Sequence, residues 1–563
     1  MRDAKSDFRV MLMNILPFDE YPLSESLGIE YLNAILRNAG YQSQALVRRV
    51  SEINGKTIPE LFNGVRLAGF TMYSETAEPL FSIAKELKKL PDPPHVVAGG
   101  PLAFFHAEDI LRDCGHIDSA VKGEGYDAIL SLAEALRMHE PLDNCVNLFF
   151  RRNGIITTSP MADSLRPMDT LPFATRTLLQ ENRGALAATM VTQMGCPGVC
   201  RFCTEASIYR AMTKSIPPED VKTARIMSPK RVVDEMEWAW KTTGFDSFEI
   251  DDSSFEGSGS EGKNRLWDIS MEIIKRRLPI YFMCNFRAES FSGNDDELMG
   301  KLGDAGLSLV FIGVESGHDQ ALKYFNKRAR RAHNMASIEY FRRMGLNVET
   351  GFIMFHARTT FDELRDNLSF LLDAGYTWDA DIYSTDLALF PGMPIIESLN
   401  KERLIAPQYS YSRPYEWMFA DHRVGRLMDY LRRKRPLAGN SFAVSHPLLE
   451  LDTLMAKLRK DRALESLAVE FSIKIKSVKN GYGEILADWF HQIAHAAEAD
   501  ASEHELAGIT SDCKGRIAEA SFHRIIRVII SDIEKAIVAA GRGYVKRQAP
   551  WGDVIYPLRM FTE

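Results

Sequence analysis

Three cysteines of this 563-residue chain, Cys196, Cys200 and Cys203, stand in one short segment with the spacing Cys-x-x-x-Cys-x-x-Cys. One loop with this spacing can present three thiolates to a single inorganic cluster. Three thiolates on a four-iron cluster leave one iron without a protein ligand, and an open metal position is where substrate or cofactor chemistry takes place. The segment therefore predicts a 4Fe-4S cluster with one open iron.

Two structural alternatives are less favoured. A zinc knot needs a fourth ligand, but no histidine occurs between His139 and His318, and the next cysteine downstream is Cys284. A disulfide is disfavoured because seven cysteines is an odd and sparse count, and because no apolar leader at Met1 indicates an oxidising compartment.

The cysteine spacing, with the aromatic Phe202 directly before the last cysteine, resembles the signature of the radical S-adenosylmethionine (SAM) superfamily. The resemblance implies that the open iron binds the amino and carboxylate groups of SAM. It also implies that an electron from the reduced cluster splits the sulfonium into methionine and a 5′-deoxyadenosyl radical. In such enzymes the cofactor carries the difficult chemistry and the protein positions it.

Length and composition fit a soluble enzyme of several domains, with 45% hydrophobic and 26% charged residues. The net charge of -8 provides no broad basic field for nucleic acid. No apolar run approaches the roughly 20 residues that span a bilayer, so we expect a cytoplasmic protein without a membrane span. The expected parts are a Rossmann-like domain (1–150), a linker (151–185), a cluster-binding core (186–395) and a helical domain (396–563).

The first part alternates strand and helix patterns. Apolar runs at residues 9–15, 67–73, 95–100 and 119–121 are separated by amphipathic helical patterns such as residues 27–38. This alternation predicts an α/β fold with a doubly wound parallel sheet, in which ligands lie beyond the carboxyl ends of the strands. The residues at those strand ends are Thr71, Met72, Tyr73, Ser74, Gly99, Gly100, Gly123, Glu124 and Gly125.

The order of these strand-end segments is similar to that in the cobalamin-binding domain that precedes many radical SAM cores, and implies that they border a bound cobalamin. Mutase-type domains supply a histidine to cobalt after their first strand, but residues 17–28 contain none. We therefore expect cobalamin without a histidine ligand, with Met72, Tyr73 or Ser74 beneath the corrin. The alternative is a degenerate domain that binds nothing and only packs against the core.

A turn at Asn153-Gly154 predicts a hairpin before the linker. Beyond it, six strand patterns alternate with helices, which predicts the partial (β/α)6 barrel that the resemblance also implies. The cysteine loop follows the first of these strands, and reactive groups on parallel barrels gather at that end of the strands. The six strand patterns cover residues 187–193, 247–252, 280–287, 309–315, 347–354 and 380–387.

Charged residues end the second and third core strands. Glu249, Asp251 and Asp252 end the second, where the resembled family contacts the SAM amino group; helix caps or surface pairs are the alternative. Arg287 ends the third and matches the geometry of the methionyl carboxylate, although an internal ion pair is an equal alternative.

Residues 312–317 resemble the fourth-strand motif of radical SAM enzymes with a cobalamin or related domain, which implies that Glu315 contacts the ribose or methionyl group of SAM. Residues 351–354 match the next strand, so Ile353 is expected beside adenine. Where the family often continues Gly-x-Pro, this chain has His356, which either faces substrate or is structural.

After residue 395 the resemblance fades and helical periodicity dominates, as at residues 454–467, 484–497 and 520–540. We expect a helical cap over the open barrel mouth. The aromatic segment 409–417 either stacks on a substrate or packs between barrel and cap, and the basic run 431–435 is best explained as a solvated helix end.

Taken together, these features predict a cobalamin-dependent radical SAM methyltransferase acting on a poorly activated carbon of a small molecule or peptide. The resemblance implies that one SAM methylates Co(I) cobalamin and that a second is cleaved to the radical that removes a substrate hydrogen. The substrate radical then takes the methyl group, and a flavodoxin or ferredoxin returns the electron.

Two other functions remain open. The same cofactors serve cyclases and ring-rearranging oxidoreductases, or a polar methyl transfer without radicals. A protein of another class, a sensor that binds cobalamin and a cluster, would not turn over SAM. The sequence does not distinguish substrates, because specificity resides in the unmatched helical domain.

Overall fold

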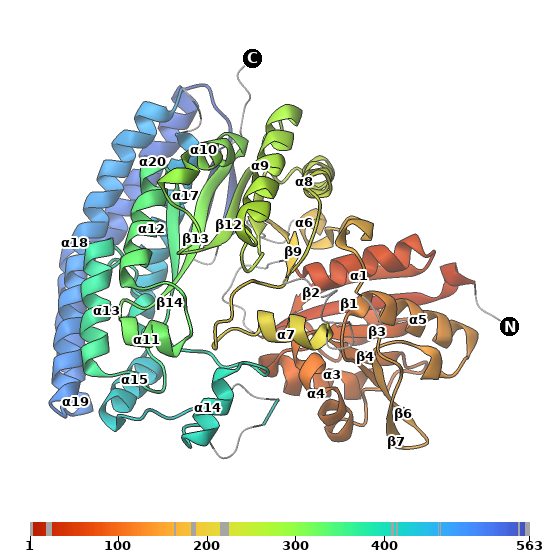
Figure 1. Cartoon of the computed structure of the whole chain (residues 1–563). Coiled ribbons are helices and arrows are strands. Elements are labelled where there is room, and N and C mark those ends of the chain that lie inside the picture. Colours follow the sequence, from red (N-terminus) through yellow and green to blue (C-terminus); the bar gives the residue numbers. More distant parts are fainter. Residues whose placement is uncertain are drawn as a thin grey trace.

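The computed structural model places three parts side by side: an N-terminal sheet with helices, a central sheet with helices, and a layer of long C-terminal helices (Figure 1). None of the described helices is long and apolar enough to cross a membrane. The structure describes residues 4–17, 25–162, 165–181, 187–213, 224–406, 410–412, 415–459, 461, 463–549 and 552–557.

The N-terminal sheet has the order β2-β1-β3-β4-β5-β6-β7, in which the first five strands are parallel. The chain runs outward from β1 to β2 and returns to β3, so the topological switch point lies between β1 and β3. The strands are β1 (Arg9–Leu16), β2 (Gln42–Arg49), β3 (Val65–Thr71), β4 (His95–Gly99), β5 (Ser119–Val121), β6 (Leu148–Arg152) and β7 (Ile155–Thr158).

Helices cover both faces of this sheet, which explains its nearly continuous apolar strands. Helices α1 (Leu27–Asn38) and α5 (Gly125–Met138) bury one face. Helices α2 (Thr57–Phe62), α3 (Ala77–Leu87) and α4 (Gly100–Asp113) bury the other. The predicted doubly wound α/β class is confirmed, and β6 and β7 form the hairpin expected around Asn153-Gly154.

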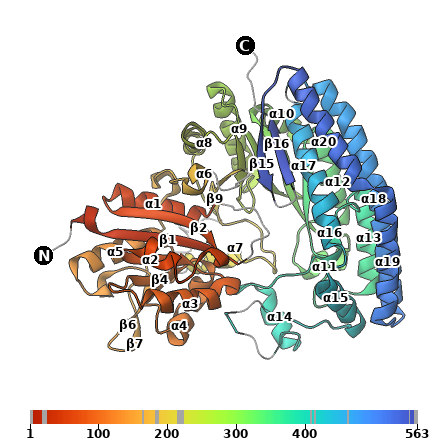
Figure 2. The same ribbon diagram turned by 180° about the vertical axis from the view of Figure 1, so that it is seen from behind.

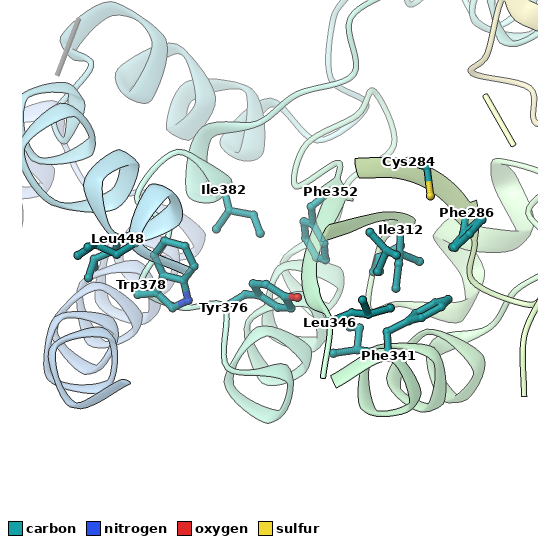
Figure 3. Packing of buried hydrophobic residues seen from close by; sticks show 14 of the residues in the cluster. Cys284, Phe286, Ile312, Phe341, Leu346, Phe352, Tyr376, Trp378, Ile382 and Leu448 are labelled. Carbon is teal, nitrogen blue, oxygen red and sulfur yellow. The ribbon is translucent and has the colours of Figure 1, made fainter. Parts of the chain in front are cut away.

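The central sheet is parallel, with the order β14-β13-β12-β11-β8. Its buried even-numbered side chains pack on the outer helices, as Figure 3 shows for Phe286 and Ile312 beside Phe341. The strands are β8 (Ala188–Met190), β11 (Ser247–Ile250), β12 (Tyr281–Arg287), β13 (Leu307–Glu315) and β14 (Asn347–Phe352). The helices between and after them are α8 (Pro229–Thr243), α9 (Gly259–Arg276), α10 (Asp296–Ala305), α11 (Asp319–Tyr324), α12 (Arg331–Arg343) and α13 (Phe361–Ala374).

The sixth expected strand, residues 380–387, is not formed. A short turn, Ile382–Ser384, stands there, and a single parallel bridge joins Phe355 to Asp386. Asp379 explains the difference, because its carboxylate accepts the backbone N–H of Asp381 at 3.0 Å. Such local bonds from short polar side chains compete with a strand ladder.

The C-terminal part is helical, as predicted, except for a final antiparallel hairpin, β15 (Tyr544–Ala549) with β16 (Gly552–Pro557), beside α17 (Figure 2). Helix α17 (His446–Leu458) packs against β13 and β14, and the 34-residue helix α18 (Glu465–Glu498) packs against α13. The other helices are α14 (Ile395–Lys401), α15 (His422–Lys434), α16 (Ala438–Asn440), α19 (Glu503–Ala520) and α20 (Phe522–Ala539).

A buried ionic network joins the N-terminal part to the central part. Arg176 has no exposed side-chain surface and pairs with Glu25 at 2.8 Å and Glu235 at 3.3 Å. The Tyr31 hydroxyl of α1 donates to Glu235 of α8 at 2.8 Å, and Glu30 accepts the backbone N–H of Thr177 at 3.0 Å. These contacts fix the position of the two sheets relative to each other.

Candidate active site

The cysteine loop begins directly after β9 (Gln193–Met194), which pairs with β10 (Arg225–Ile226). All three cysteines are free thiols and partly buried. An ideal Cβ on Gly198 would lie 3.3 Å from the Cys196 sulfur and 3.9 Å from the Cys200 sulfur, so both sulfurs border this glycine. Burial raises the pKa of Cys200 to about 11. The loop therefore holds protonated thiols that must lose protons to bind metal.

The loop is held by the segment that follows α11. The Arg201 N–H donates to the Phe325 carbonyl at 2.9 Å, and Asn326 Nδ2 donates to the Val199 carbonyl at 2.9 Å. The predicted site residue Phe202 meets Phe325 edge to face, with ring centroids 5.3 Å apart. Phe202 thus fixes the loop through a ring contact.

Glu315 lies beside the cysteines, at the end of β13. Its backbone has φ +66°, and its carbonyl accepts the Ile353 N–H at 2.7 Å. Lys327 Nζ lies 3.3 Å from Glu315 Oε1, and both side chains are largely buried. The charges of Lys327 and Glu315 both act on the Cys200 thiol. The structure thus gathers Glu315, Ile353 and Lys327 beside the cysteine loop, and contact of Glu315 or Ile353 with SAM stays a prediction.

Two glycines pack closely against the side chains around this pair. A Cβ on Gly313 would lie 2.7 Å from Glu315 Oε1 and 3.0 Å from Lys327 Nζ. A Cβ on Gly351, opposite it on β14, would lie 3.1 Å from the Phe311 ring. Gly313 therefore leaves room for the Glu315–Lys327 pair, and Gly351 leaves room for the Phe311 ring, at the carboxyl ends of two neighbouring strands.

Arg287 faces the same place, and its charge acts on the Cys196 thiol. Its guanidinium donates to Glu256 Oε1 at 2.9 Å and to the Gly257 carbonyl at 3.1 Å. The internal ion pair considered from the sequence is therefore present, and the pairing of Arg287 with a SAM carboxylate stays a prediction.

The three acids that end the second core strand have different surroundings. Asp252 is fully buried and accepts the N–H groups of Thr192 at 2.6 Å and Gln193 at 3.0 Å, so it anchors the approach to the cysteine loop. Glu249 is half-buried and Asp251 keeps an exposed side chain, and desolvation by the surrounding protein raises the pKa of both carboxyls. Of the three, these two are the candidates for ligand contact.

His356 does not open to a substrate space. It is 2% exposed, and its Nε2 lies 3.1 Å from both carboxylate oxygens of Glu363. Its ring also stacks on Tyr324 at 5.3 Å. The structural interpretation considered from the sequence holds for this histidine.

The N-terminal strand ends form the other border of the site. Met72 is fully buried in the core, with its N–H bonded to the Gly99 carbonyl at 2.8 Å. Gly100 has φ +85°, and a Cβ there would lie 2.8 Å from Thr71 Cγ2. Tyr73 instead keeps 37% of its surface exposed, while Ser74 is buried. Of the residues after β3, Tyr73 therefore offers an open side chain.

Two observations connect the carboxyl end of the N-terminal sheet to the carboxyl end of the central sheet. Glu124, between Gly123 and Gly125, pairs with Arg225 of β10 at 2.5 Å, and β10 pairs with the strand that leads into Cys196. Burial raises the pKa of the Tyr73 phenol, and the charges of Glu75 and of Asp251 at the end of the second core strand raise it further. The carboxyl ends of both sheets therefore border one site.

Sequence reasoning missed Arg225, Glu256 and Glu349. Arg225 gives no local signal, because its partner lies 101 residues upstream. Glu256 lies only a few residues after the acidic end of β11, and this closeness in sequence could have indicated that it belongs to the same site. Glu349 lines a cavity of about 80 Å³ between β13, β14 and α17, where burial and the charge of Glu450 raise its pKa to about 8.

The aromatic segment after α14 packs between the parts where it is described. Tyr411 stacks on His106 of α4 at 5.1 Å and donates to Asp113 at 2.8 Å. Trp417 Nε1 donates to the Leu387 carbonyl at 3.0 Å. Residues 407–409, 413 and 414, which include Tyr409, lie outside the described residues. The described members of the segment thus support the packing interpretation.

Comparisons with known proteins agree with this architecture. Residues 190–371 match the family model of the Radical SAM superfamily. An uncharacterized methyltransferase of Pyrococcus horikoshii is 24% identical over 363 residues, which cover 62% of this chain and 74% of that protein. The anaerobic magnesium-protoporphyrin IX monomethyl ester cyclase of Cereibacter sphaeroides is 23% identical, and the match covers 66% of this chain but only 60% of the cyclase.

Solved structures extend the similarity beyond the central part. The cobalamin-dependent SAM radical enzyme OxsB, with aqua-cobalamin and SAM bound, matches with a TM-score of 0.66 and 17% identity, over 94% of this chain and 81% of that chain. The methyltransferase TsrM of Kitasatospora setae, with cobalamin and a [4Fe-4S] cluster, matches with a TM-score of 0.55 and 19% identity, over 70% and 75%. The chain therefore carries a radical SAM domain at residues 190–371, within a fold that it shares with OxsB over nearly its whole length.

Proposed function

We propose that the protein is a cobalamin-dependent radical SAM methyltransferase that methylates a poorly activated carbon. The observation that carries this proposal is that the carboxyl ends of the N-terminal strands are joined to the strands that lead into the cysteine loop. The Glu124–Arg225 ion pair connects the glycine-rich edge of the N-terminal sheet to the strand pair that leads into Cys196. A cofactor at each border would share one reaction space.

The residues at the cysteine loop fit a 4Fe-4S cluster with SAM. Cys196, Cys200 and Cys203 would hold the cluster, because sulfurs of two of them already border one glycine and none is in a disulfide. Glu315 and Asp251 offer carboxylates to the ribose and amino groups of SAM. When bound, a reduced cluster supplies the electron that cleaves the SAM sulfonium.

The edge of the N-terminal sheet fits a bulky planar ligand. Gly99 and Gly100 keep side chains away from the end of β4, and Tyr73, which follows the neighbouring strand β3, keeps 37% of its surface exposed. Tyr73 would face the corrin, while Met72 stays in the core. Bound cobalamin would supply the methyl group, and burial of the junction between the two sheets would exclude water from the radical.

The test is anaerobic reconstitution of the wild type and of the Cys196→Ala/Cys200→Ala/Cys203→Ala variant. We expect stoichiometric cobalamin in both proteins, with iron and sulfide only in the wild type. Methyl-deuterated SAM should then deliver its label to bound cobalamin, and dithionite should produce 5′-deoxyadenosine. A wild type that binds the cluster but no cobalamin would refute the methyltransferase assignment.

The cyclase relatives favour a second candidate, an oxidative cyclisation with the same two cofactors. Relatives from Cereibacter sphaeroides and Rubrivivax gelatinosus carry that name at 23% and 24% identity. Product mass separates the candidates, because methylation adds one methylene to the substrate and cyclisation removes hydrogen without adding carbon.

A further inference from the structure

A basic surface lies directly behind the cysteine loop. Lys323 of α11 and Arg328 and Arg330 of the connection to α12 are exposed, and none of the three forms an ion pair within the part of the chain that the structure describes. We call these three residues the basic patch. The whole chain has a net charge of -8, so three cations without an ion pair among the eight residues 323–330 contrast with the rest of the described molecule.

The segment that carries the basic patch also holds the cysteine loop. Phe325 and Asn326 bond to the backbone of Arg201 and Val199 at 2.9 Å each, as described above. Val199, between the first two cysteines, is 44% exposed. A protein that docks on the basic patch would therefore also contact the outer side of the cysteine loop. Lys327, in the same segment as the patch, instead points inward and pairs with Glu315.

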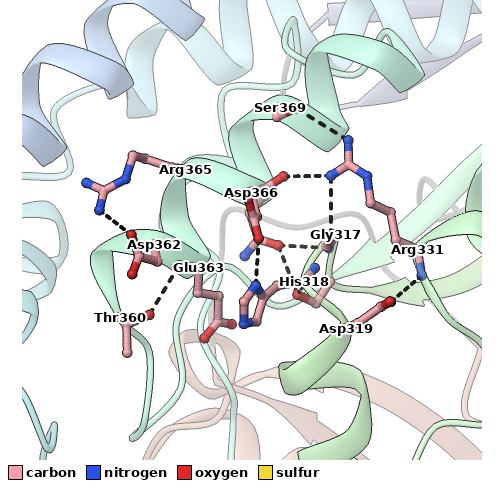
Figure 4. A network of polar contacts seen from close by, with 12 residues as sticks. Gly317, His318, Asp319, Arg331, Thr360, Asp362, Glu363, Arg365, Asp366 and Ser369 are labelled. Atoms are coloured by element: carbon pink, nitrogen blue, oxygen red, sulfur yellow. Dashed lines mark hydrogen bonds and ion pairs between the residues drawn. The ribbon is translucent and has the colours of Figure 1, made fainter.

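The segment is anchored. Arg331 donates to the carbonyls of Gly317 at 3.3 Å and Asp366 at 2.9 Å (Figure 4). It also pairs with Asp373 at 2.7 Å. Asp319 accepts the Arg331 N–H at 2.8 Å.

The neighbouring acids leave the patch positive. Asp366 pairs with His318 at 2.8 Å, and Glu402 pairs with Arg358 at 2.5 Å. These carboxylates therefore already have side-chain partners outside the patch, and the three cations of the patch lie on an anchored segment.

We propose that the basic patch is the docking surface for an acidic, one-electron donor protein of the flavodoxin type. This inference rests on the proposed function, because cleavage of SAM consumes an electron that must enter through the cluster. One electron leaves the donor and enters the cluster, so the donor is oxidised by one electron and the cluster is reduced by one. Complementary charge accelerates such encounters and fixes their orientation.

The test compares two variants with equal changes of net charge. Lys323→Glu/Arg328→Glu/Arg330→Glu reverses the basic patch. Lys476→Glu/Arg524→Glu/Arg527→Glu reverses three exposed cations on α18 and α20, far from the cysteine loop. Stopped-flow absorbance measures the rate at which a reduced acidic flavodoxin reduces the reconstituted cluster. Biolayer interferometry measures the affinity of the oxidised flavodoxin for the cluster-free protein.

We expect reversal of the patch to slow cluster reduction by at least about tenfold and to weaken binding similarly, with little effect of the control variant. The wild-type rate should fall between about 50 and 300 mM salt, because exposed charges are screened. Cluster reduction by dithionite should be equal in all three proteins. Equal flavodoxin rates in both variants would overturn the inference.

The two proposals fail differently. If dithionite yields no 5′-deoxyadenosine from the wild type, the radical SAM function is wrong, whereas the rates of cluster reduction still report on docking. If dithionite supports SAM cleavage in every protein and reversal of the patch leaves flavodoxin reduction unchanged, only the docking surface is wrong.

Discussion

Replacing Arg176 with leucine should destabilise the protein through the interface between its two sheets. The guanidinium is fully buried between Glu25 and Glu235, and it also donates to the Thr189 carbonyl within β8, the first strand of the central sheet along the chain. Leucine fills part of the volume but leaves two carboxylates and a carbonyl without this cation.

The structure sets the size of the effect. Removing one partner of a buried ion pair typically costs about 3–5 kcal/mol, because the remaining charge stays buried. The matched control is Arg66→Leu, whose ion pair with Asp92 at 2.6 Å is exposed and should be worth about 0–1 kcal/mol. Urea unfolding of the cofactor-free proteins, followed by circular dichroism, measures both changes.

The loss should depend on pH. Burial already raises the pKa of Glu25 in the wild type, where Arg176 opposes the shift. Without Arg176 the folded-state pKa rises further above the unfolded value, so the folded protein binds more protons than the unfolded chain. The destabilisation should therefore shrink as pH falls through the raised pKa. A loss below about 1 kcal/mol, or one that grows as the pH falls, would refute this account of the interface.

Three further predictions concern the cluster side of the site. Lys327→Met leaves Glu315 without its cation and should raise the KM for SAM at least about tenfold, equivalent to about 1.4 kcal/mol. Lys327→Arg keeps the cation and should retain most of the affinity. Assays of 5′-deoxyadenosine formation with dithionite measure both KM values. Gly313→Ala should weaken SAM binding at unchanged iron content, because its Cβ would lie 2.7 Å from Glu315 Oε1; normal affinity in equilibrium dialysis would contradict the crowding. Since burial raises the pKa of Cys200 to about 11, cluster reconstitution should be faster near pH 9 than near pH 7, and iron uptake that is independent of pH would exclude thiol deprotonation as the slow step.

Periodicity predicted most of the fold because most strands are buried on both faces. The edge strand β2, with the sequence QSQALVRR, escaped notice because its polar residues interrupt the apolar pattern. The segment 380–387 reads as a strand, but local bonds from Asp379 turn it away from the sheet. The hairpin of β15 and β16 was missed because it directly follows the long helical pattern of α20, and its own strand signal is weak.

The residues of the candidate site fall into those that a short motif predicts and those that only the folded structure brings together. The cysteine spacing, Glu315 and Ile353 were found because each lies within a short motif at a strand end. Arg225 could not be found, because its meaning depends on Glu124, which lies far away in the sequence. Neighbours within a strand or loop can be inferred from spacing, whereas contacts between sheets require the folded arrangement.

The Glu124–Arg225 ion pair has a thermodynamic consequence. It links the loop at the cobalamin border to the strand pair that leads into the cysteine loop. A shift of either segment when its cofactor binds therefore changes the binding free energy of the other cofactor. Coupling of this kind is reciprocal: whatever factor cobalamin contributes to cluster affinity, the cluster must contribute to cobalamin affinity. The order in which the cell loads the two cofactors would then change the intermediates of maturation, while the fully loaded state would be the same by either route.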